Sequence, residues 1–199
     1  MPRILSDADV ADFRERLCDA AEDLFARLGP DAVTIRQLAR AVGVSPMTPY
    51  RYFRDKDDIL ALVRTRAFNA FAETLEAAFD SITGALEQSQ AVGRAYLDFA
   101  FANPRAYKLM FDLDLPLNDT WPDLTAASDR ARRTQVRHVQ AMLDAHLITG
   151  EADALGQTYW AILHGGITLE MAGQIPSGSA RAIANLSGAA LTRGLHARA

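Results

Sequence analysis

The sequence predicts an all-α protein, and three observations support that prediction. Apolar residues recur at steps of three and four along most of the 199-residue chain, which is the spacing of one buried helix face. Glycine and proline fall between these periodic segments, where they end helices. The composition, with 49% hydrophobic and 23% charged residues, is that of an ordinary folded protein whose length allows an ample core.

The first helix is expected from about residue 10 to residue 28. Its apolar face is formed by Val10, Phe13, Leu17, Ala21, Leu24 and Leu28. Gly29-Pro30 is expected to end it, because glycine accepts the left-handed closing conformation and proline cannot continue the helical hydrogen bonds. Cys18 is the one cysteine of the chain, so it forms no intramolecular disulfide and is expected to be a small buried residue.

The next segment predicts two short helices joined by a tight turn. Thr34 and Gln37 have the spacing of a capping box, in which the two side chains satisfy backbone groups at a helix start. Gly43 is expected to end this second helix, because the bend there favours a residue without a β-carbon. Ser45 is then expected to cap a third, short helix with Pro46 at its first position. Three helices with this turn make a helix-turn-helix.

The rest of the chain is expected to be helical as well. A fourth helix begins near Lys56 and crosses residues 60–66, where no Gly, Pro or Ser linker occurs, and helical spacing continues to Gly84. Trp121 is expected to anchor a proline-bounded loop over residues 113–122. Further helices are expected at about residues 91–103, directly after Asn103-Pro104, and at about residues 124–147, 152–172 and 177–196. We therefore expect a helix-turn-helix domain at residues 1–63 and a larger helical domain at residues 64–199.

Positive charge is concentrated in one short segment. The chain has a formal net charge of -4, yet residues 34–56 hold five basic residues and one acid, whereas residues 7–31 hold eight acids and three bases. An α-helix fits the major groove of B-DNA, which is about 12 Å wide, so a short helix within this basic segment is suited to duplex DNA. The side chains available to base edges are Met47, Thr48, Tyr50, Arg51 and Tyr52, and those placed to meet phosphates are Thr34, Arg36, Ser45 and Lys56.

Several of these residues also have a purely structural interpretation. Tyr50, Tyr52 and Phe53 are residue types that form the core of a small helical bundle, and Arg40 and Arg54 are equally consistent with ordinary solvent-exposed arginines. Both interpretations remain open at this point, because spacing alone does not separate a core aromatic from one that contacts DNA.

Three motifs carry a resemblance to a known family. They are Thr-Ile-Arg-Gln-Leu-Ala at residues 34–39, Val-Gly-Val-Ser at residues 42–45, and Thr-Pro-Tyr-Arg-Tyr-Phe at residues 48–53, with Lys56 three residues further on. With this spacing, residues 19–60 resemble the DNA-binding domain of TetR-family transcriptional regulators. Pro49 departs from the branched aliphatic residues that are commoner in the family, and it removes a backbone donor. The resemblance implies phosphate contacts from Thr34, Tyr50, Tyr52 and Lys56, and base or near-base contacts from Arg36, Met47, Thr48 and Arg51.

The second half of the chain predicts a pocket for a small, largely apolar molecule. Its aromatic-rich middle lies next to the proline-bounded loop, and apolar walls with a few polar groups are typical of small-molecule sites. The candidate ligand-binding residues are Tyr96, Phe99, Tyr107, Met110, Phe111, Trp121, Trp160 and His164. Plain core packing is the alternative for each of them. Residues 160–166 also resemble the Trp...His-Gly (WHG) signature of the C-terminal domain of one TetR subgroup, and His164 is either a pocket wall or a core residue.

A helical dimer seam is the last predicted site. Gly166 permits a close helix approach, and Ile183, Leu186 and Ala190 follow with helical spacing. The alternative is that these residues form a contact within one chain.

Little in the sequence indicates catalysis or membrane insertion. His138 and His146 are eight residues apart, which is not the four-residue spacing of a helical zinc pair, so we expect no catalytic residue, metal or cofactor. The longest uncharged stretch, residues 154–169, is shorter than the roughly 20 apolar residues of a membrane span, and no signal peptide is evident, so a cytoplasmic location is expected.

The resulting hypothesis is a ligand-responsive transcriptional regulator, not an enzyme. The family resemblance implies a homodimer that occupies a pseudo-palindromic operator in double-stranded DNA as a repressor, and that a small effector releases. Two alternatives from other classes stay open. One is an architectural DNA-binding protein without an inducer, and the other is a helical enzyme or ligand carrier with a vestigial N-terminal bundle.

Overall fold

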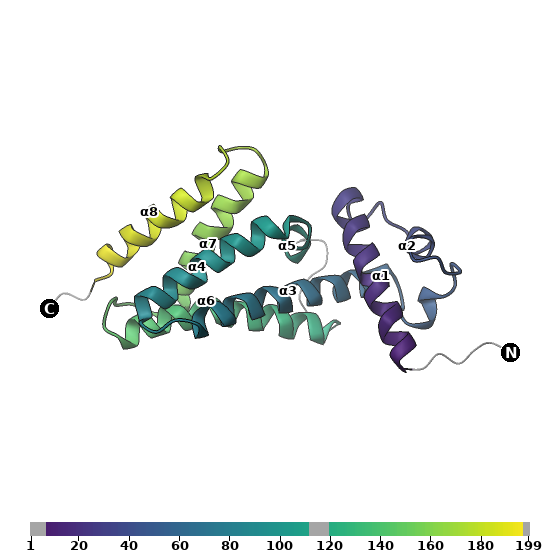
Figure 1. Ribbon diagram of the computed structural model, residues 1–199, viewed down its shortest axis with the longest axis horizontal. Helices are drawn as coiled ribbons and strands as arrows, with labels where there is room; N and C mark the ends of the chain where they lie inside the picture. The colour runs from purple at the N-terminus through teal and green to yellow at the C-terminus, as the bar shows by residue number, and fades with distance from the viewer. Residues whose placement is uncertain (1–6, 112–119, 197–199) are drawn as a thin grey trace. The chain divides into compact units, whose positions relative to one another are not determined.

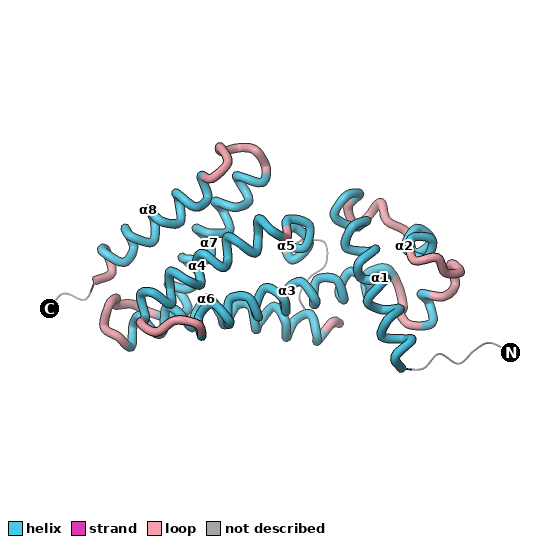
Figure 2. Tube along the Cα trace, viewed as in Figure 1, coloured by secondary structure: helices cyan, strands magenta, loops and turns pink. Residues whose placement is uncertain are grey.

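The computed structural model describes residues 7–111 and 120–196. These residues are helical nearly throughout and contain no strand, which confirms the all-α fold class (Figure 1, Figure 2). The chain divides into two compact units. The first unit combines Met1–Ala67 with Arg105–Ala126, and the second combines Phe68–Pro104 with Ala127–Ala199.

Eight α-helices and one 3-10 helix are present in the described residues. They are α1 (Asp7–Leu28), α2 (Ile35–Ala41), the 3-10 helix η1 (Pro49–Arg51), α3 (Lys56–Asp80), α4 (Ala85–Ala102), α5 (Pro104–Met110), α6 (Pro122–Asp144), α7 (Ala152–Met171) and α8 (Ser179–Gly194). The uninterrupted passage of α3 through residues 60–66 is as predicted. Helix α4 begins six residues earlier than the expected start at residue 91. Most of the expected loop, residues 113–119, lies outside the described residues, and α6 begins at its last position, Pro122.

The core of the first unit forms around α1. Phe13, Leu17 and Ala21 are buried as the spacing predicted, and Phe25 completes this face, whereas Leu28 at the helix end is 44% exposed. Gly29, with a φ of 81°, turns the chain out of α1 in the left-handed region that glycine adopts without strain. The predicted capping box of α2 is present. In it the Thr34 hydroxyl accepts from the Gln37 backbone N–H at 3.3 Å, and the Thr34 backbone N–H donates to the Gln37 amide oxygen at 2.7 Å.

The prediction of a third α-helix after Ser45 is wrong. From Ser45 to Arg51 the chain forms a tight turn followed by the single 3-10 turn η1. In an α-helix starting at Pro46, the backbone N–H of residue 49 donates to the Ser45 carbonyl, but Pro49 has no N–H and its ring collides with that carbonyl. Thr48 donates to the Ser45 carbonyl instead, at 2.9 Å, and this tighter bond sets the path of the segment.

The second unit is held together by packing among α4, α7 and α8. In Figure 1, α7 and α8 run side by side at the C-terminal end of the chain. Gly166 of α7 is buried there, and a β-carbon at this position would lie 3.5 Å from the Ala180 Cα atom, which is an ordinary contact distance, so the packing of α7 on α8 does not require a glycine here. Among the described helices, none combines the length and the apolarity that crossing a bilayer requires.

Candidate nucleic-acid interface and effector cavity

The basic segment presents three arginines that are free of carboxylate partners. Arg36 and Arg40 on α2 and Arg51 in η1 are exposed, and none of them forms an ion pair with a residue in the described part of the chain. Two uncharged side chains of the same segment also face solvent, since Met47 is 67% exposed and Tyr50 is 52% exposed. These five side chains are available to an external partner, and four of them belong to the predicted DNA-contacting set.

Other residues of the predicted set are already engaged inside the unit. The Lys56 ammonium donates to the Pro30 carbonyl at 2.6 Å, which ties the start of α3 to the turn after α1. The Tyr52 ring lies 5.1 Å from the Phe13 ring and is half-buried. The Thr34 hydroxyl caps α2, and the Ser45 hydroxyl accepts from the Met47 backbone N–H at 3.4 Å. Each of these residues has a structural role beside the predicted DNA contact.

Arg54 is paired with an acid. Its guanidinium forms an ion pair with Asp58, with the Nε atom 2.8 Å from the carboxylate, and the Arg54 backbone N–H donates to the same carboxylate at 2.9 Å. The Trp121 indole also donates to Asp58, at 3.0 Å. The side-chain hydrogen bond from Arg54 lowers the Asp58 pKa to about 2. Asp58 therefore stays ionised and neutralises the charge of Arg54 at neutral pH.

The core interpretation holds for Phe53. Its ring is 6% exposed, and the Arg14 guanidinium lies 5.2 Å from the ring centroid. Thr48 is half-buried, between the exposed Met47 and the buried Pro49. The structure thus separates the aromatic motif into an exposed Tyr50, a half-buried Tyr52 and a buried Phe53.

The predicted ligand-binding residues are divided between the two units. Tyr107, Met110, Phe111 and Trp121 belong to the first unit, and Tyr96, Phe99, Trp160 and His164 belong to the second. Four of them pack against other aromatic rings. The Tyr96 and Phe99 rings lie 4.9 Å and 5.2 Å from the Phe71 ring, and Tyr107 lies 5.1 Å from Phe111. Their ligand-binding role stays a prediction.

Trp160 and His164 lie one turn apart on α7, as their spacing predicted. The Trp160 indole donates to the Tyr96 hydroxyl at 3.0 Å, which links α7 to the buried face of α4. Both side chains are half-buried, and burial lowers the His164 pKa below its ordinary value.

A cavity lies between α4, α6, α7 and α8, within the second unit. It has a volume of about 530 Å³ and is lined by residues that the sequence did not single out as a site, among them Leu97, His138, Tyr159 and Ile162. None of the eight predicted ligand-binding residues lines this cavity. Its lining comes from four separate helices and consists of common residue types, so spacing along the chain gave no signal for it.

His138 forms part of the inner wall of that cavity. The side chain is 3% exposed, and its Nδ1 atom lies 3.0 Å from the Ser89 hydroxyl. Burial lowers the His138 pKa to about 4, so the ring is neutral at pH 7. Within residues 7–111 and 120–196, no group of three or more His, Cys, Asp or Glu side chains is placed to hold a metal ion.

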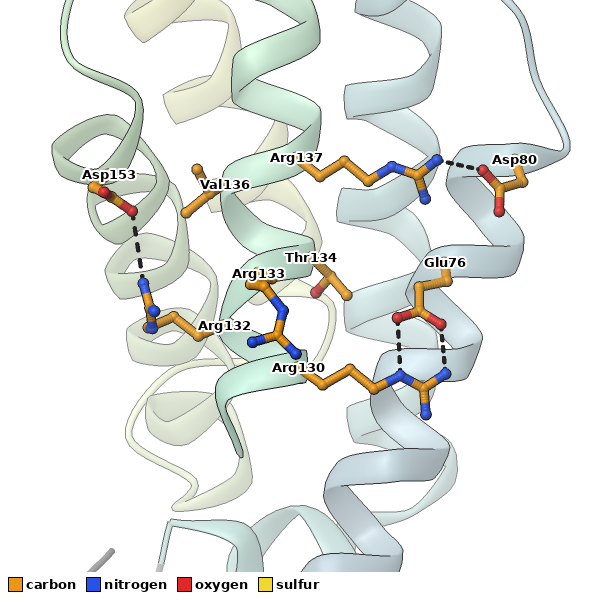
Figure 3. A pocket seen from close by; sticks show the side chains of 9 residues that line it. All are labelled: Glu76, Asp80, Arg130, Arg132, Arg133, Thr134, Val136, Arg137 and Asp153. Atoms are coloured by element: carbon orange, nitrogen blue, oxygen red, sulfur yellow. Dashed lines mark hydrogen bonds and ion pairs between the residues drawn. The ribbon is translucent and has the colours of Figure 1, made fainter. Parts of the chain in front are cut away.

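A second hollow, between α3, α6 and α7, is rich in arginine (Figure 3). Arg130 of α6 donates to Glu76 of α3 through two hydrogen bonds of 3.0 Å and 2.5 Å. Arg137 pairs with Asp80 at 2.7 Å, and Arg132 pairs with Asp153 at 3.6 Å. These carboxylates neutralise most of the positive charge, so this hollow is a network of ion pairs between helices.

The four predicted dimer residues differ in exposure. Gly166 is buried against α8, and Ile183 of α8 is half-buried, with its Cγ2 atom 3.8 Å from a β-carbon placed on Gly166. Both therefore contribute to packing within the chain. Leu186 is 71% exposed and Ala190 is exposed, so these two form the part of the predicted seam that faces solvent.

Comparison with known proteins identifies relatives of both parts of the chain. The sequence profile described as "Bacterial regulatory proteins, tetR family" matches residues 17–63, and the profile described as "Tetracyclin repressor-like, C-terminal domain" matches residues 89–192. An uncharacterized HTH-type transcriptional regulator of Haemophilus influenzae is 32% identical over 93 residues, which are 47% of this chain and 50% of that protein. Another, of Mycobacterium tuberculosis, is 27% identical over 164 residues, which are 80% of this chain and 71% of that protein.

Solved structures share the whole fold. A protein of unknown function from Rhodococcus sp. RHA1 superposes with a TM-score of 0.81 at 25% identity, covering 99% of this chain and 100% of that one. The TetR family transcriptional regulator PfmR from Thermus thermophilus superposes with a TM-score of 0.71 at 20% identity, covering 92% of this chain and 100% of that one. The profile matches together cover the helix-turn-helix and most of the second unit. This chain therefore belongs to the TetR family of transcriptional regulators.

Proposed function

We propose that this regulator is a ligand-responsive repressor that acts as a homodimer. Residues 1–63 bind DNA and residues 64–199 bind the effector and the second protomer. Each protomer contributes one helix-turn-helix, so the operator is pseudo-palindromic, with half-sites about 34 to 36 Å or a multiple apart. A small, largely apolar effector binds the second domain and releases the protein from DNA. We further propose that the chain is not an enzyme and acts in the cytoplasm.

One observation carries the DNA-binding proposal. Arg36, Arg40 and Arg51 are exposed and have no carboxylate partner in the described residues, and Met47 and Tyr50 project from the same segment. Unpaired guanidinium groups attract phosphates and displace condensed counterions, while exposed side chains beside them reach base edges. The segment therefore combines the two kinds of contact that specific DNA binding requires.

Contacts inside the first unit link α5 and the start of α6 to α1 and to the start of α3, next to the DNA-binding segment. Arg64 on α3 donates to the Met110 carbonyl at the end of α5, at 3.0 Å, and Arg105 on α5 pairs with Asp23 of α1 at 2.6 Å. Next to the start of α6, the Trp121 indole donates to Asp58 in the first turn of α3, the same carboxylate that pairs with Arg54. A ligand that favours a different position of α5 or of the α6 start shifts these contacts, and its differential affinity for the two states sets the size of the response.

Mapping of genomic binding sites, combined with transcription measurements in a deletion strain, tests the proposal. We expect a small number of discrete sites upstream of genes, and we expect the transcription of those genes to rise when the regulator is deleted. Even coverage of the chromosome without discrete sites would instead support an architectural protein. Discrete sites with falling transcription would make it an activator.

A further inference from the structure

The cavity between α4, α6, α7 and α8 has the size and walls of a small-molecule site. Its volume of about 530 Å³ lies within the range of about 300 to 1,000 Å³ that is typical of such sites. Leu86, Leu97, Ile162 and Leu163 supply much of its apolar wall. The cavity can therefore hold the hydrocarbon part of a small organic molecule.

Two exposed arginines, Arg94 of α4 and Arg193 of α8, line this cavity, and none of its described lining residues is an aspartate or a glutamate. Neither arginine forms an ion pair within the described part of the chain. Asp98, one helical turn beyond Arg94, is the acid that its spacing favours as a partner, but Asp98 pairs with Arg181 instead. An anionic ligand group would supply the missing charge and accept charge-assisted hydrogen bonds.

Tyr159 and His138 both line this cavity. The Tyr159 hydroxyl is buried and has no hydrogen-bond partner in the described residues, although a buried polar group ordinarily has one. The Tyr159 ring packs edge-on against His138, with 5.8 Å between the ring centroids. Because His138 is neutral at pH 7 and is bonded to Ser89, the net charge of the cavity comes from the two arginines.

The arginine-rich hollow of Figure 3 is the natural competitor for an anion, and its ion pairs make it the poorer site. An incoming carboxylate there finds one arginine without an ion pair to a described residue, Arg133. To reach a second arginine it has to displace an acid, such as Glu76 from Arg130 or Asp80 from Arg137. At Arg94 and Arg193 no protein carboxylate has to be displaced. The two hollows thus differ in the cost of admitting an anion, and that difference favours the cavity between α4 and α8.

We propose that this cavity binds an amphipathic carboxylate, with the carboxylate at Arg94 and Arg193 and the apolar body against Leu97 and Ile162. This inference rests on the proposed function in one respect only, because it takes this ligand to be the effector. The proposed effector is still largely apolar but carries one negative charge. Its binding site includes none of the eight ligand-binding residues that the sequence predicted.

Calorimetric titration of the full chain with three ligands of the same chain length tests the class of ligand. The ligands are decanoate, decan-1-ol and decyltrimethylammonium, the two ions kept below their micelle concentrations and the alcohol below its solubility limit. We expect decanoate to bind about tenfold or more tightly than the other two, because only its charge complements the arginines. Equal affinity for decanoate and decan-1-ol would overturn the proposal.

Amino-acid substitutions test whether decanoate binds in this cavity. Arg94→Gln combined with Arg193→Gln is expected to lower the decanoate affinity about tenfold and to leave the decan-1-ol affinity unchanged. Arg133→Gln is the matched control, because Arg133 is exposed, forms no ion pair with a described residue and does not line the cavity, and it should leave the decanoate affinity unchanged. Full decanoate affinity in the Arg94 and Arg193 double variant would overturn the proposal.

Addition of the same ligands to the protein–DNA complex separates this inference from the proposed function. Release of DNA by decanoate, lost in the double variant, supports both. If decanoate binds with the expected dependence on Arg94 and Arg193 but the protein stays on DNA, the ligand class holds and release by effector is contradicted. If decan-1-ol releases DNA and decanoate does not bind, the ligand class is contradicted and the proposed function holds.

Discussion

Two segments of this chain are rich in arginine, and they differ in whether those arginines have partners. In residues 34–56, Arg36, Arg40 and Arg51 are exposed and form no ion pair with a described residue. In α6, Arg130, Arg132 and Arg137 each pair with a carboxylate of α3 or α7. A count of basic residues therefore does not locate a polyanion site. The local balance of charge, which depends on tertiary neighbours, decides which arginines attract DNA.

Basic residues with and without a partner also occur together within residues 34–56. Arg54 and Lys56 contribute to its charge in the sequence, yet Arg54 is bound to Asp58 and Lys56 donates to the Pro30 carbonyl. Lys56 keeps two further N–H donors for a phosphate, because an ammonium group has three. Arg54 has less to offer, since its partner is an ionised acid. Residues 34–56 thus contain basic residues that are engaged by other groups of the protein and basic residues that are exposed without an ion pair to a described residue.

The largest expected effect comes from removing two unpaired arginines. Arg36→Ala with Arg51→Ala should weaken binding to nonspecific duplex DNA about fiftyfold near 0.1 M salt, and should reduce the slope of log K against log salt by about 2. Fluorescence anisotropy over a range of salt concentrations measures both quantities. The matched control is Arg130→Ala with Arg137→Ala, and an equal loss of DNA affinity in that control would break the comparison between the two segments.

The second prediction concerns pH and the neutral residue of the effector cavity. Because the folded-state pKa of His138 is about 4, below its ordinary value of 6.5, the unfolded chain binds a proton that the folded chain excludes. This contribution to stability is complete above pH 6.5 and is lost as the pH falls towards 4. We expect a loss of about 2 kcal/mol between about pH 7.5 and pH 5. Denaturant unfolding of the native chain and of His138→Asn measures it, and an equal loss in both would show that His138 is not the cause.

The third prediction compares the same two groups of arginines by their effect on stability instead of on DNA affinity. Arg130→Ala should lower the free energy of unfolding by about 1 kcal/mol, because a partly buried guanidinium with paired hydrogen bonds to Glu76 is lost. Arg36→Ala should leave the free energy of unfolding within about 0.5 kcal/mol of the native value, as expected for an exposed residue without a partner. Chemical denaturation provides both numbers. A larger loss for Arg36→Ala than for Arg130→Ala would mean that the assignment of partners is wrong.

The smallest expected effect is a gain. Asp58→Asn keeps the shape of the side chain but removes the charge that neutralises Arg54, so Arg54 becomes available to a phosphate. We expect DNA affinity at low salt to rise about threefold and the salt slope to steepen by up to about 1. Arg54→Ala combined with Asp58→Asn should abolish the gain. Unchanged affinity in Asp58→Asn would show that Arg54 does not reach DNA.

Local features of the sequence were sufficient to predict most helices. Thr34 and Gln37 form the capping box from their spacing alone, and Gly29 ends α1 because the left-handed conformation is local to that residue. The predicted third α-helix does not form, because the cap at Ser45 is favourable but Pro49 removes the backbone donor that the helix needs four residues later. The Ser45 cap and Pro49 are both visible in the sequence, and the steric effect of Pro49 determines the structure.

Tertiary partners could not be predicted in the same way. Nothing near Lys56 in the sequence indicates that it donates to the Pro30 carbonyl, 26 residues earlier. Similarly, nothing near Arg94 indicates that Asp98 forms its ion pair with Arg181. The cavity between α4, α6, α7 and α8 is formed by scattered residues of four helices, whereas the aromatic residues stood out because of their type. Residue type is a good guide to burial and a poor guide to which buried residues border empty space.

We infer that residues 34–56 recognise a specific sequence in duplex DNA through a tight turn and the 3-10 helix. In vitro selection from random duplexes, with the purified full chain and with Arg51→Ala, tests this inference. We expect the native chain to enrich one motif of two inverted half-sites, and Arg51→Ala to relax the preference at one position in each half-site. Recovery of sequences without any shared motif by the native chain would contradict it.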